Sequence, residues 1–445
     1  MEKPDPHRPD AGFPSLAQNL RRELADGRRW LDRGIVLAYS AAAGLAVVGF
    51  TLLAEAAFGL FSRLHDFNRW SLLLWTPLCT AAIVWLTRRF APGAAGSGIP
   101  QVIAALDPEL PAASRPRFVS LRVSAAKIVL SSAGLLAGLS VGREGPSVQV
   151  AAGVMQHAQR WLGGRVPVHA LLVAGGAAGI AAAFNAPLAG IVFAIEELSR
   201  KLESRSSGLI IAAIVLAGLM AVSAFGNLSY FGVIRVPALG WAALAPGLLT
   251  TLVAGLAGGF FAKLLAMSLT GGGGRLGAWR ALFPLRFAAA CGLAVAAIGL
   301  VTGGASFGAG SDAVKHMLAG QADQPLFYVP LKFLATWLTA WSGVPGGIFA
   351  PSLSIGAGIG HDVSLLAGSS ELAPALIAMG MAAFLAAVTQ APLTSFIIVM
   401  EMVDGHAMVL SLMTAAMLAS LVSRLMTRPL YETLADFMVA GQRRD

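Results

Sequence analysis

The sequence predicts an all-helical integral membrane protein that is built from two related halves. Three observations carry this prediction: few charged residues, apolar segments that recur along the chain, and a match of the chain to itself at one offset. Of the 445 residues, 56% are hydrophobic and 12% are charged, whereas a soluble domain carries about 25% charged residues. The apolar segments occupy residues 34–61, 72–84, 125–141, 170–183, 209–225, 244–267, 287–301 and 376–388.

These segments are uneven in length. A helix needs about 20 apolar residues to span a bilayer, and several segments are shorter or longer than that and contain Gly or Pro. Interrupted helices are tolerated in membrane proteins where they lie within the protein and away from lipid. We therefore expect many tilted and broken helices instead of a simple up-and-down bundle.

The net charge of +9 sits mainly in the tails and in short polar gaps. The basic residues concerned are Arg21, Arg22, Arg28, Arg29, Arg33, Arg200, Lys201, Arg205, Arg443 and Arg444. Because cationic loops mark the cytoplasmic side, we expect a multi-pass protein of the cell (inner) membrane with both termini in the cytoplasm. The charge forms no aromatic-interleaved basic face, so no nucleic-acid partner is expected. The polar residues 1–33 also lack the apolar core of a secretory signal.

The chain carries no recognisable metal or cofactor motif. Cys79 and Cys291 each lie inside an apolar segment, which favours buried free thiols over a disulfide. The histidines show no metal-binding spacing and no phosphate-binding loop occurs, so we expect no metal, no cofactor and no direct use of ATP. Ser306 followed by His316 is a loose hint of a serine protease, but the repeat explains this region better. We expect a transport protein and not an enzyme.

A single offset relates the two halves. Residues 142–146 (Gly-Arg-Glu-Gly-Pro) align with residues 347–351 (Gly-Ile-Phe-Ala-Pro) at an offset of 205, and the same offset aligns Glu196 with Glu401. Internal repeats are typical of transporters, whose substrate site lies near the midplane where broken helices of both repeats meet. The offset alone does not distinguish parallel from inverted repeats.

The repeat predicts how the chain is organised. Residues 96–98 match residues 308–310 at an offset of 212, so the loops differ in length between the halves. The expected parts are an N-terminal cytoplasmic tail and helix (1–33), a first membrane repeat (34–226), a linker (227–242), a second membrane repeat (243–427) and a C-terminal helix and tail (428–445).

Three segments combine a glycine-containing turn with a proline and an apolar run: residues 96–100 (Gly-Ser-Gly-Ile-Pro), 142–146 and 347–351. Proline is well tolerated in the first turn of a helix, so each segment predicts a helix N-terminus inside the protein. Such termini bind anions through unpaired N–H groups and the helix dipole. Three such termini at the midplane would bind an anion without a fully charged side chain, which would hold the anion too tightly to release it. The alternative is that they are plain loops between helices.

In their order and separation, these segments resemble the signature motifs of the CLC family of chloride channels and chloride/proton antiporters. The resemblance runs from about residue 34 to the helix near Tyr431. It is to the prokaryotic type without a C-terminal regulatory domain, because the chain ends shortly after Tyr431. One departure is Gln101, where some relatives carry Glu. The resemblance implies a CLC-type fold of two inverted repeats, and a homodimer in the lipid bilayer whose subunits each hold a path for chloride and protons.

The resemblance also implies the chloride-binding residues. They are the hydroxyl groups of Ser97 and Tyr431 and the backbone N–H groups of Ile348 and Phe349. Ser97 has an alternative role as the cap of the helix that starts at Ile99, and Tyr431 as an aromatic anchor at the membrane interface.

Glu144 lies at the helix N-terminus predicted for the second motif, where it is flanked by Gly142, Arg143 and Gly145. A carboxylate there behaves as a tethered anion that occupies the place of chloride. Once protonated, it loses this attraction and swings away. Glu144 would then be both the external gate and the proton acceptor. The alternative is a surface ion pair with Arg143.

Glu196 and Glu197 end an apolar helix and point about 100° apart on it. Because Glu196 has the repeat mate Glu401, we expect a structural role common to both halves, whereas Glu197 aligns with Met402 and breaks the symmetry. An unmatched carboxylate in a membrane is a functional candidate, and the resemblance points to Glu197 as the internal proton-transfer group. The alternative is a solvated helix end beside Arg200.

Together these residues predict a chloride/proton antiporter with Glu144 as its gating and proton-carrying carboxylate. The alternative is a passive voltage- or pH-gated chloride channel on the same scaffold. Glu197 favours exchange, because channel members of the family tend to lack an acid there, and the intact Ser97 motif and Tyr431 disfavour a fluoride exporter. Small-residue-rich helices near residues 186–196, 209–225, 391–400 and 410–425 are expected to pack in the dimer.

Overall fold

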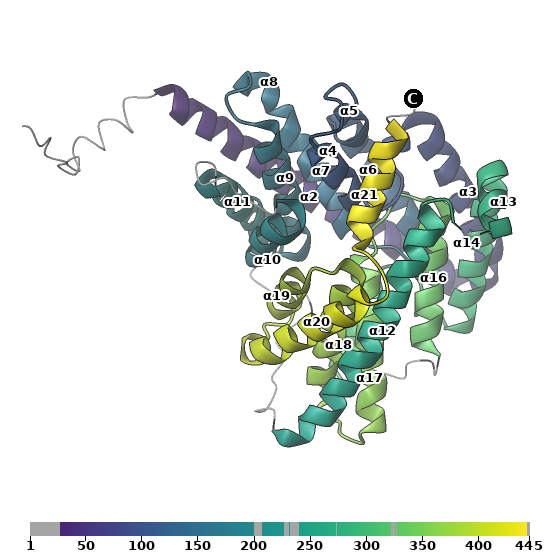
Figure 1. Cartoon of the computed structure of the whole chain (residues 1–445). Coiled ribbons are helices and arrows are strands. Elements are labelled where there is room, and N and C mark those ends of the chain that lie inside the picture. Colours follow the sequence, from purple (N-terminus) through teal and green to yellow (C-terminus); the bar gives the residue numbers. More distant parts are fainter. Residues whose placement is uncertain are drawn as a thin grey trace, which may run out of the picture.

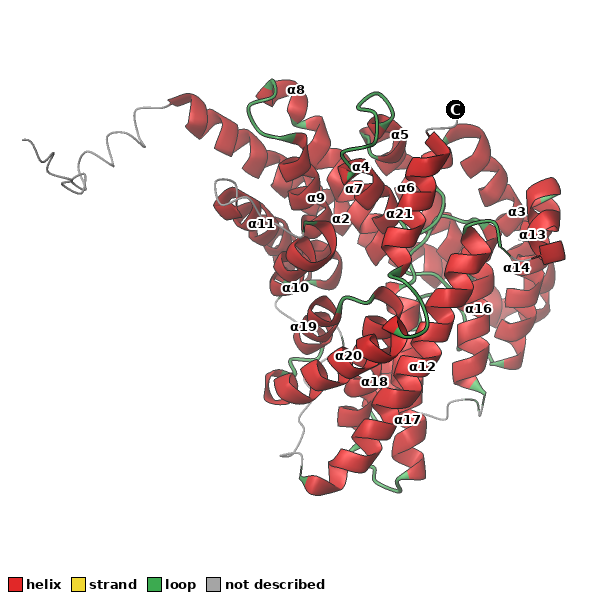
Figure 2. Ribbon diagram, in the orientation of Figure 1, coloured by secondary structure: helices red, strands yellow, loops and turns green. Residues whose placement is uncertain are grey.

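The computed structural model describes residues 27–199, 207–226, 231, 240–272, 274–321, 325 and 327–442. These residues form helices and loops and no β-strand (Figures 1 and 2). Most of the expected N-terminal tail and linker lies outside the described residues, as do Arg21, Arg22, Arg200, Lys201, Arg205, Arg443 and Arg444.

The helices of the first half differ widely in length, as the uneven apolar segments predict. They are α2 (Gly27–Phe67), α3 (Leu72–Phe90), α4 (Ile99–Leu106), α5 (Arg115–Phe118), α6 (Leu121–Leu136), α7 (Glu144–His157), α8 (Gln159–Leu162), α9 (Val168–Phe184), α10 (Pro187–Phe193) and α11 (Ser207–Phe225). A π-helical turn, η3 (Ala194–Leu198), continues α10.

The second half repeats this variety. Its helices are α12 (Leu244–Leu269), α13 (Gly274–Leu282), α14 (Pro284–Val301), α15 (Ser311–Leu318), α16 (Tyr328–Ser342), α17 (Phe349–Leu366), α18 (Ala373–Thr389), α19 (Pro392–Met402), α20 (Val409–Arg424) and α21 (Leu430–Gln442). Short 3-10 turns stand before α3, α4, α12 and α20.

The same local sequence breaks a helix at equivalent points of the two halves. Asn185 takes the left-handed conformation (φ 55°) that ends α9, and Pro187 then opens α10. Gln390 (φ 61°) ends α18 in the same way, and Pro392 opens α19. A left-handed residue satisfies the last carbonyls of a helix and proline fits the first turn of the next, so both breaks are encoded locally.

Seven helical stretches in the described part of the chain are long and apolar enough to cross a membrane. They are Gly27–Phe67, Arg69–Phe90, Arg115–Leu136, Gly208–Phe225, Trp241–Leu269, Pro284–Val301 and His406–Arg424. The shorter α9 and α18 are apolar on all sides and almost entirely buried, as expected of helices that are enclosed by others. The protein is therefore a multi-pass membrane protein whose central helices are covered by protein.

Small residues bring these central helices together. α7 packs on α9, and its repeat counterpart α17 packs on α18. A Cβ atom on Gly175 would lie 2.7 Å from the Cα of Ala152, and one on Gly380 would lie 2.2 Å from the carbonyl oxygen of Gly356. Helices within a membrane associate through such close backbone contact, so these two repeat-related glycines are required by the packing.

The last helix returns to the first half. α21 packs against α4 (Figure 1), which brings the N-terminus of α21 to the loop that precedes α4. Tyr431 and Ser97 are thereby neighbours although they are distant in sequence.

Candidate functional site

The three motif loops meet and are bonded to one another. The N–H of Gly346 donates to the carbonyl oxygen of Gly96 at 3.0 Å. Gly142 and Gly347 exchange two bonds, each N–H donating to the other's carbonyl oxygen at 2.8 Å, in an antiparallel bridge. Because these two glycines are repeat mates, the pair of bonds is symmetric: a local two-fold axis between the halves would exchange one glycine with the other.

Only glycine permits this approach. A Cβ atom on Gly145 would lie 2.5 Å from Ser97 Oγ and 3.4 Å from Gly347 Cα. A Cβ atom on Gly142 would lie 2.3 Å from Glu144 Oε2. The glycines of the motifs therefore let backbone and carboxylate pack where a side chain would clash.

Each motif begins a helix at this meeting point. α7 begins at Glu144 and α17 at Phe349, and neither N-cap residue, Arg143 or Ile348, makes a side-chain capping bond. The first N–H groups of a helix have no partner within the helix. Two N-termini whose first N–H groups have no partner within their helices thus point into the region between the halves, where they favour negative charge.

Ser97 and Tyr431 bring two hydroxyl groups to the same place. Both oxygens are buried without a hydrogen-bond partner, close to each other but not bonded. The N-cap of α4 is Gly98, whose N–H donates to Oε1 of Gln101 at 2.9 Å. Ser97 therefore does not cap that helix. Tyr431 is 1% exposed and its ring lies 6.0 Å from that of Phe349 between centroids, so it is not an interfacial anchor. Two buried donors without partners fit an anion as substrate.

Glu144 lies among the same groups and is 2% exposed. The backbone N–H groups of Arg143, Glu144 and Ala350 face its carboxylate, and Oε2 has no hydrogen-bond partner. The carboxylate therefore sits at the N-termini of both α7 and α17. Arg143 does not form the surface ion pair with Glu144, because its Nη1 lies 2.9 Å from Oε1 of Glu55.

A cavity of about 880 Å³ reaches Glu144 and is called here the vestibule. Its charged and titratable lining residues are Glu55, Arg143, Glu144, Asp312, Lys315 and His316. The hydroxyl of Ser306 bonds to Thr302 Oγ1 at 2.9 Å and lies fully buried, whereas His316 is exposed. The arrangement of a serine protease is therefore not formed here.

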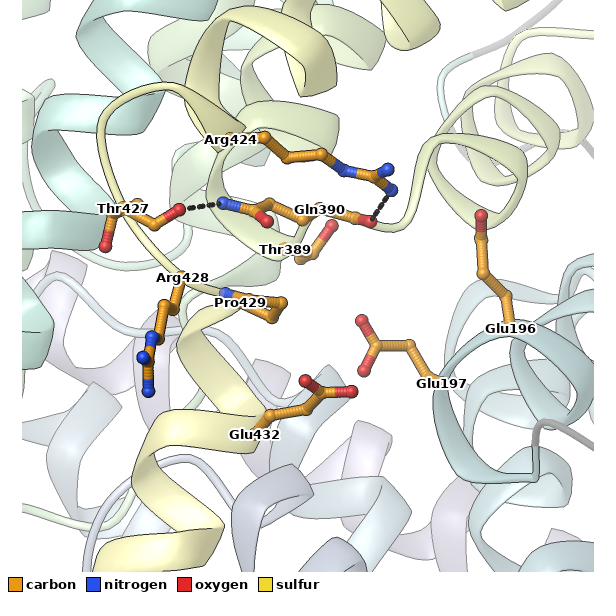
Figure 3. A pocket seen from close by; sticks show the side chains of 9 residues that line it. All are labelled: Glu196, Glu197, Thr389, Gln390, Arg424, Thr427, Arg428, Pro429 and Glu432. Carbon is orange, nitrogen blue, oxygen red and sulfur yellow. Dashed lines mark hydrogen bonds between the residues drawn. The ribbon is translucent and has the colours of Figure 1, made fainter.

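A second cavity, of about 520 Å³, is called the Glu197 pocket. Figure 3 shows Glu197 and Glu432 approaching it from different elements, η3 and α21, with both carboxylates directed to its middle. Arg424 and Arg428 also line it. The pocket thus offers carboxylates and cations around one water-accessible space, next to the N-terminus of α21 and Tyr431.

The π-helical turn explains how adjacent glutamates serve different purposes. A π-turn inserts one extra residue into a helix and is frequent at functional sites. Both glutamates line the Glu197 pocket. Glu196 Oε1 and Oε2 accept the N–H groups of Leu393 and Thr394 at 3.0 and 2.7 Å, whereas the carboxylate of Glu197 is directed to the middle of the pocket (Figure 3).

Glu401, the repeat mate of Glu196, makes the corresponding contact from the second half to the first. Glu401 Oε1 and Oε2 accept the N–H groups of Leu188 and Ala189 at 3.2 and 2.8 Å. Each carboxylate therefore binds the first turn of the other half's helix, α19 or α10. This reciprocal contact is a structural role shared by both halves, as the repeat predicts for Glu196.

Two buried lysines support the motif loops. Nζ of Lys127 donates to the carbonyl oxygens of Ala94 and Gly96 at 2.8 and 2.6 Å. Nζ of Lys332, its mate at the offset of 205, donates to those of Ser306 and Gly308 at 2.9 and 2.8 Å. Both side chains are fully buried.

Neither lysine was predicted as part of the site, and neither was Glu55 or Glu432. The lysines had a signal in the sequence, since each is a cation inside an apolar segment at the repeat offset. Glu55 and Glu432 had none, because their importance depends on which helices meet. Within the described residues no cluster of His, Cys, Asp or Glu side chains could hold a metal ion.

Comparison with known proteins agrees with this geometry. The model of the family described as "Voltage gated chloride channel" matches residues 79–424. A solved structure described as a slow cyanobacterial Cl⁻/H⁺ antiporter is 26% identical, with a TM-score of 0.76 over 93% of this chain and 99% of that one. A CLC-type fluoride/proton antiporter is 19% identical (TM-score 0.76; 92% and 98% covered), and a eukaryotic CLC transporter is 20% identical (TM-score 0.71; 95% and 75% covered). The expected all-helical CLC-type fold is confirmed.

Proposed function

The chain belongs to the family of voltage-gated chloride channels, and we propose that within this family it is a chloride/proton antiporter. Members of the family are transporters or channels and not enzymes. One observation carries the proposal: the buried carboxylate of Glu144 sits at two helix N-termini, beside two buried hydroxyl groups without partners. Such a site holds either its own carboxylate or a free anion.

Chloride is the substrate that these donors suit. The hydroxyl groups of Ser97 and Tyr431 and the N–H groups of Ile348 and Phe349 would surround it. None of these donors carries a full charge, so the ion is held without being trapped. Lys127 holds the loop that carries Ser97 in place, because its Nζ donates to the carbonyl oxygen of Gly96.

Glu144 links the anion to the proton. Deprotonated, its carboxylate competes with chloride for the N-termini of α7 and α17. When a proton from the vestibule neutralises it, the attraction to these N-termini is lost and the side chain leaves. Chloride then takes its place, and the return of the carboxylate requires the proton to depart. Because the Glu144 carboxylate and chloride exclude each other from this site, chloride flux and proton flux are coupled.

Glu197 would pass protons between Glu144 and the other side of the membrane. It lines the Glu197 pocket, and both glutamates lie within electrostatic reach of Tyr431. The cyanobacterial relative is described as a Cl⁻/H⁺ antiporter, which also favours exchange over the passive channel. The intact Ser97 motif and Tyr431 favour chloride over fluoride.

We also propose a homodimer in the cell (inner) membrane with both termini in the cytoplasm. Apolar side chains are exposed on η3, α11 and α20: Ile195 is 46%, Leu219 is 50% and Leu421 is 58% exposed. A second copy of the chain would cover them. The repeats would extend over residues 34–226 and 243–427, so that each subunit holds a complete path.

The test uses purified protein in liposomes. An imposed chloride gradient should drive protons against their own gradient, because the two share Glu144. Glu144→Gln should keep chloride flux but lose proton movement and pH dependence, whereas Asp436→Asn, an exposed carboxylate on α21, should keep both. Chloride flux without proton movement in the unmodified protein would establish the channel alternative. Chloride-driven proton uptake in the Glu144→Gln protein would remove Glu144 from the mechanism.

A further inference from the structure

An ion pair stands beside the proposed gate. Nη1 of Arg143 donates to Oε1 of Glu55 at 2.9 Å and to the carbonyl oxygen of Thr51 at 3.3 Å. Arg143 is the N-cap residue of α7, one residue before Glu144. Thr51 and Glu55 are one turn apart on α2. The two helices are packed on each other. The bond therefore joins the part of α2 that carries Thr51 and Glu55 to the start of α7, the helix that begins with Glu144.

The pair is asymmetric in its surroundings. The side chain of Arg143 is 9% exposed and that of Glu55 is 57% exposed. Both line the vestibule that leads to Glu144. A guanidinium group that is this buried needs a compensating charge, and Glu55 supplies it from the solvent side.

The charge of Arg143 reaches the Glu144 carboxylate, and Glu55 limits this effect. The backbone N–H of Arg143 also faces the Glu144 carboxylate, and its guanidinium group is the cation nearest in sequence. Glu55 directs that group toward α2 and offsets its charge. The other charged or titratable groups that line the vestibule are Asp312, Lys315 and His316 on α15, and Tyr431 on α21 lies within electrostatic reach of Glu144.

We propose that Glu55 is a positioning residue for the gate: by holding and neutralising Arg143, it keeps the Glu144 carboxylate free to take up a proton and leave. This inference rests on the proposed function, and it assigns a role to a residue outside the signature motifs. It acts through Arg143 and not by contact with chloride.

The direction of the effect follows from charge. When Glu55 is made neutral, Arg143 keeps its full charge beside Glu144 and can turn toward it. Both changes favour the charged carboxylate in the anion site. A more acidic solution is then needed to open the gate. For a charge at this range in a partly solvated site, we expect the midpoint of the pH dependence of chloride flux to move down by about half a unit.

The experiment measures chloride efflux from liposomes with equal pH on both sides, from acidic to neutral. Glu55→Gln keeps an acceptor for Arg143 but removes the charge, so the protein should fold and show the acid shift. Glu55→Asp keeps the charge and should restore the midpoint toward that of the unmodified protein. Asp312→Asn, which removes an exposed carboxylate on α15 from the same vestibule, should shift the midpoint by less than Glu55→Gln does.

The gate itself provides the last control. In the Glu144→Gln background, Glu55→Gln should have no further effect on the pH dependence. An unchanged midpoint in Glu55→Gln, or an equal shift in Asp312→Asn, would overturn the inference while Glu144 could still act as the gate. If instead the Glu144→Gln protein retains proton coupling, the proposed function fails, and that result is read independently of Glu55.

Discussion

Glu196→Gln and Glu401→Gln should weaken the contact between the two halves by similar amounts. Each carboxylate accepts two N–H groups in the first turn of a helix that belongs to the other half, at 2.7 and 3.0 Å for Glu196 and at 2.8 and 3.2 Å for Glu401. Gln has the same shape as Glu but presents one amide group in place of an oxygen. That group is a donor, so it opposes one of the two N–H groups and its bond is lost.

The size of the loss can be worked from these bonds. A side-chain cap at a helix N-terminus stabilises a protein by about 0.5–2 kcal/mol, and a negative charge there adds about 0.3–1 kcal/mol. Because one oxygen remains as an acceptor, we expect each variant to lose about 1–2 kcal/mol in the free energy of unfolding. The two carboxylates share no bond, so the double variant should lose about the sum of the two single losses.

Unfolding by denaturant in detergent micelles, followed by tryptophan fluorescence, measures these losses. Chloride and proton flux are measured on the same preparations, and both single variants should remain coupled. The reasoning would be refuted if Glu401→Gln were destabilised and Glu196→Gln were as stable as the unmodified protein. It would also be refuted if Glu196→Gln lost proton movement at unchanged stability, because Glu196 would then act as a proton carrier in the Glu197 pocket.

Three further predictions concern transport and assembly. Glu197→Gln should abolish proton movement while chloride still flows, and intact coupling in this variant at good expression would favour the passive channel. Ser97→Pro should shift preference from chloride toward nitrate, measured by anion competition in liposomes. A charge-assisted hydrogen bond is worth about 1.5–3 kcal/mol, part of which Tyr431 or water recovers, and an unchanged nitrate-to-chloride ratio would remove Ser97 from the anion site. Trp in place of the exposed Ile195 or Leu421 should yield monomers that still transport, because each subunit holds its own path; unmodified protein that is monomeric both in mild detergent and in lipid would contradict the dimer.

Much of the fold could be predicted because its signals are local or periodic. The helix breaks at Asn185 and Gln390 are each followed by a proline at the same spacing, and a proline ends or kinks a helix that runs into it. The motif glycines likewise predicted turns before helix N-termini. The repeat offset then linked positions far apart in the chain, and it predicted the common role of Glu196 and Glu401.

The pairings that depend on side-chain direction could not be predicted. Glu196 and Glu197 differ by one position in sequence and both line the Glu197 pocket, and only the structure shows that Glu196 is bonded to the other half while Glu197 is directed to the middle of the pocket (Figure 3). Glu432 reaches the same pocket because α21 folds back on α4. Arg143 was weighed as a partner of Glu144, but in the structure α2 brings Glu55 to it.

By itself, the sequence determined that the chain is an all-helical membrane protein, that it contains two related halves, and that three glycine-proline segments begin helices within it. Composition, periodicity and turn chemistry act over a few residues, so they can be read from the chain. The tertiary structure decided which charges and hydroxyl groups face one another: Glu144 against two helix N-termini, Ser97 against Tyr431, and Arg143 against Glu55. These contacts depend on close backbone packing between segments that are far apart in the chain, where a shift of one helix turn would exchange every partner.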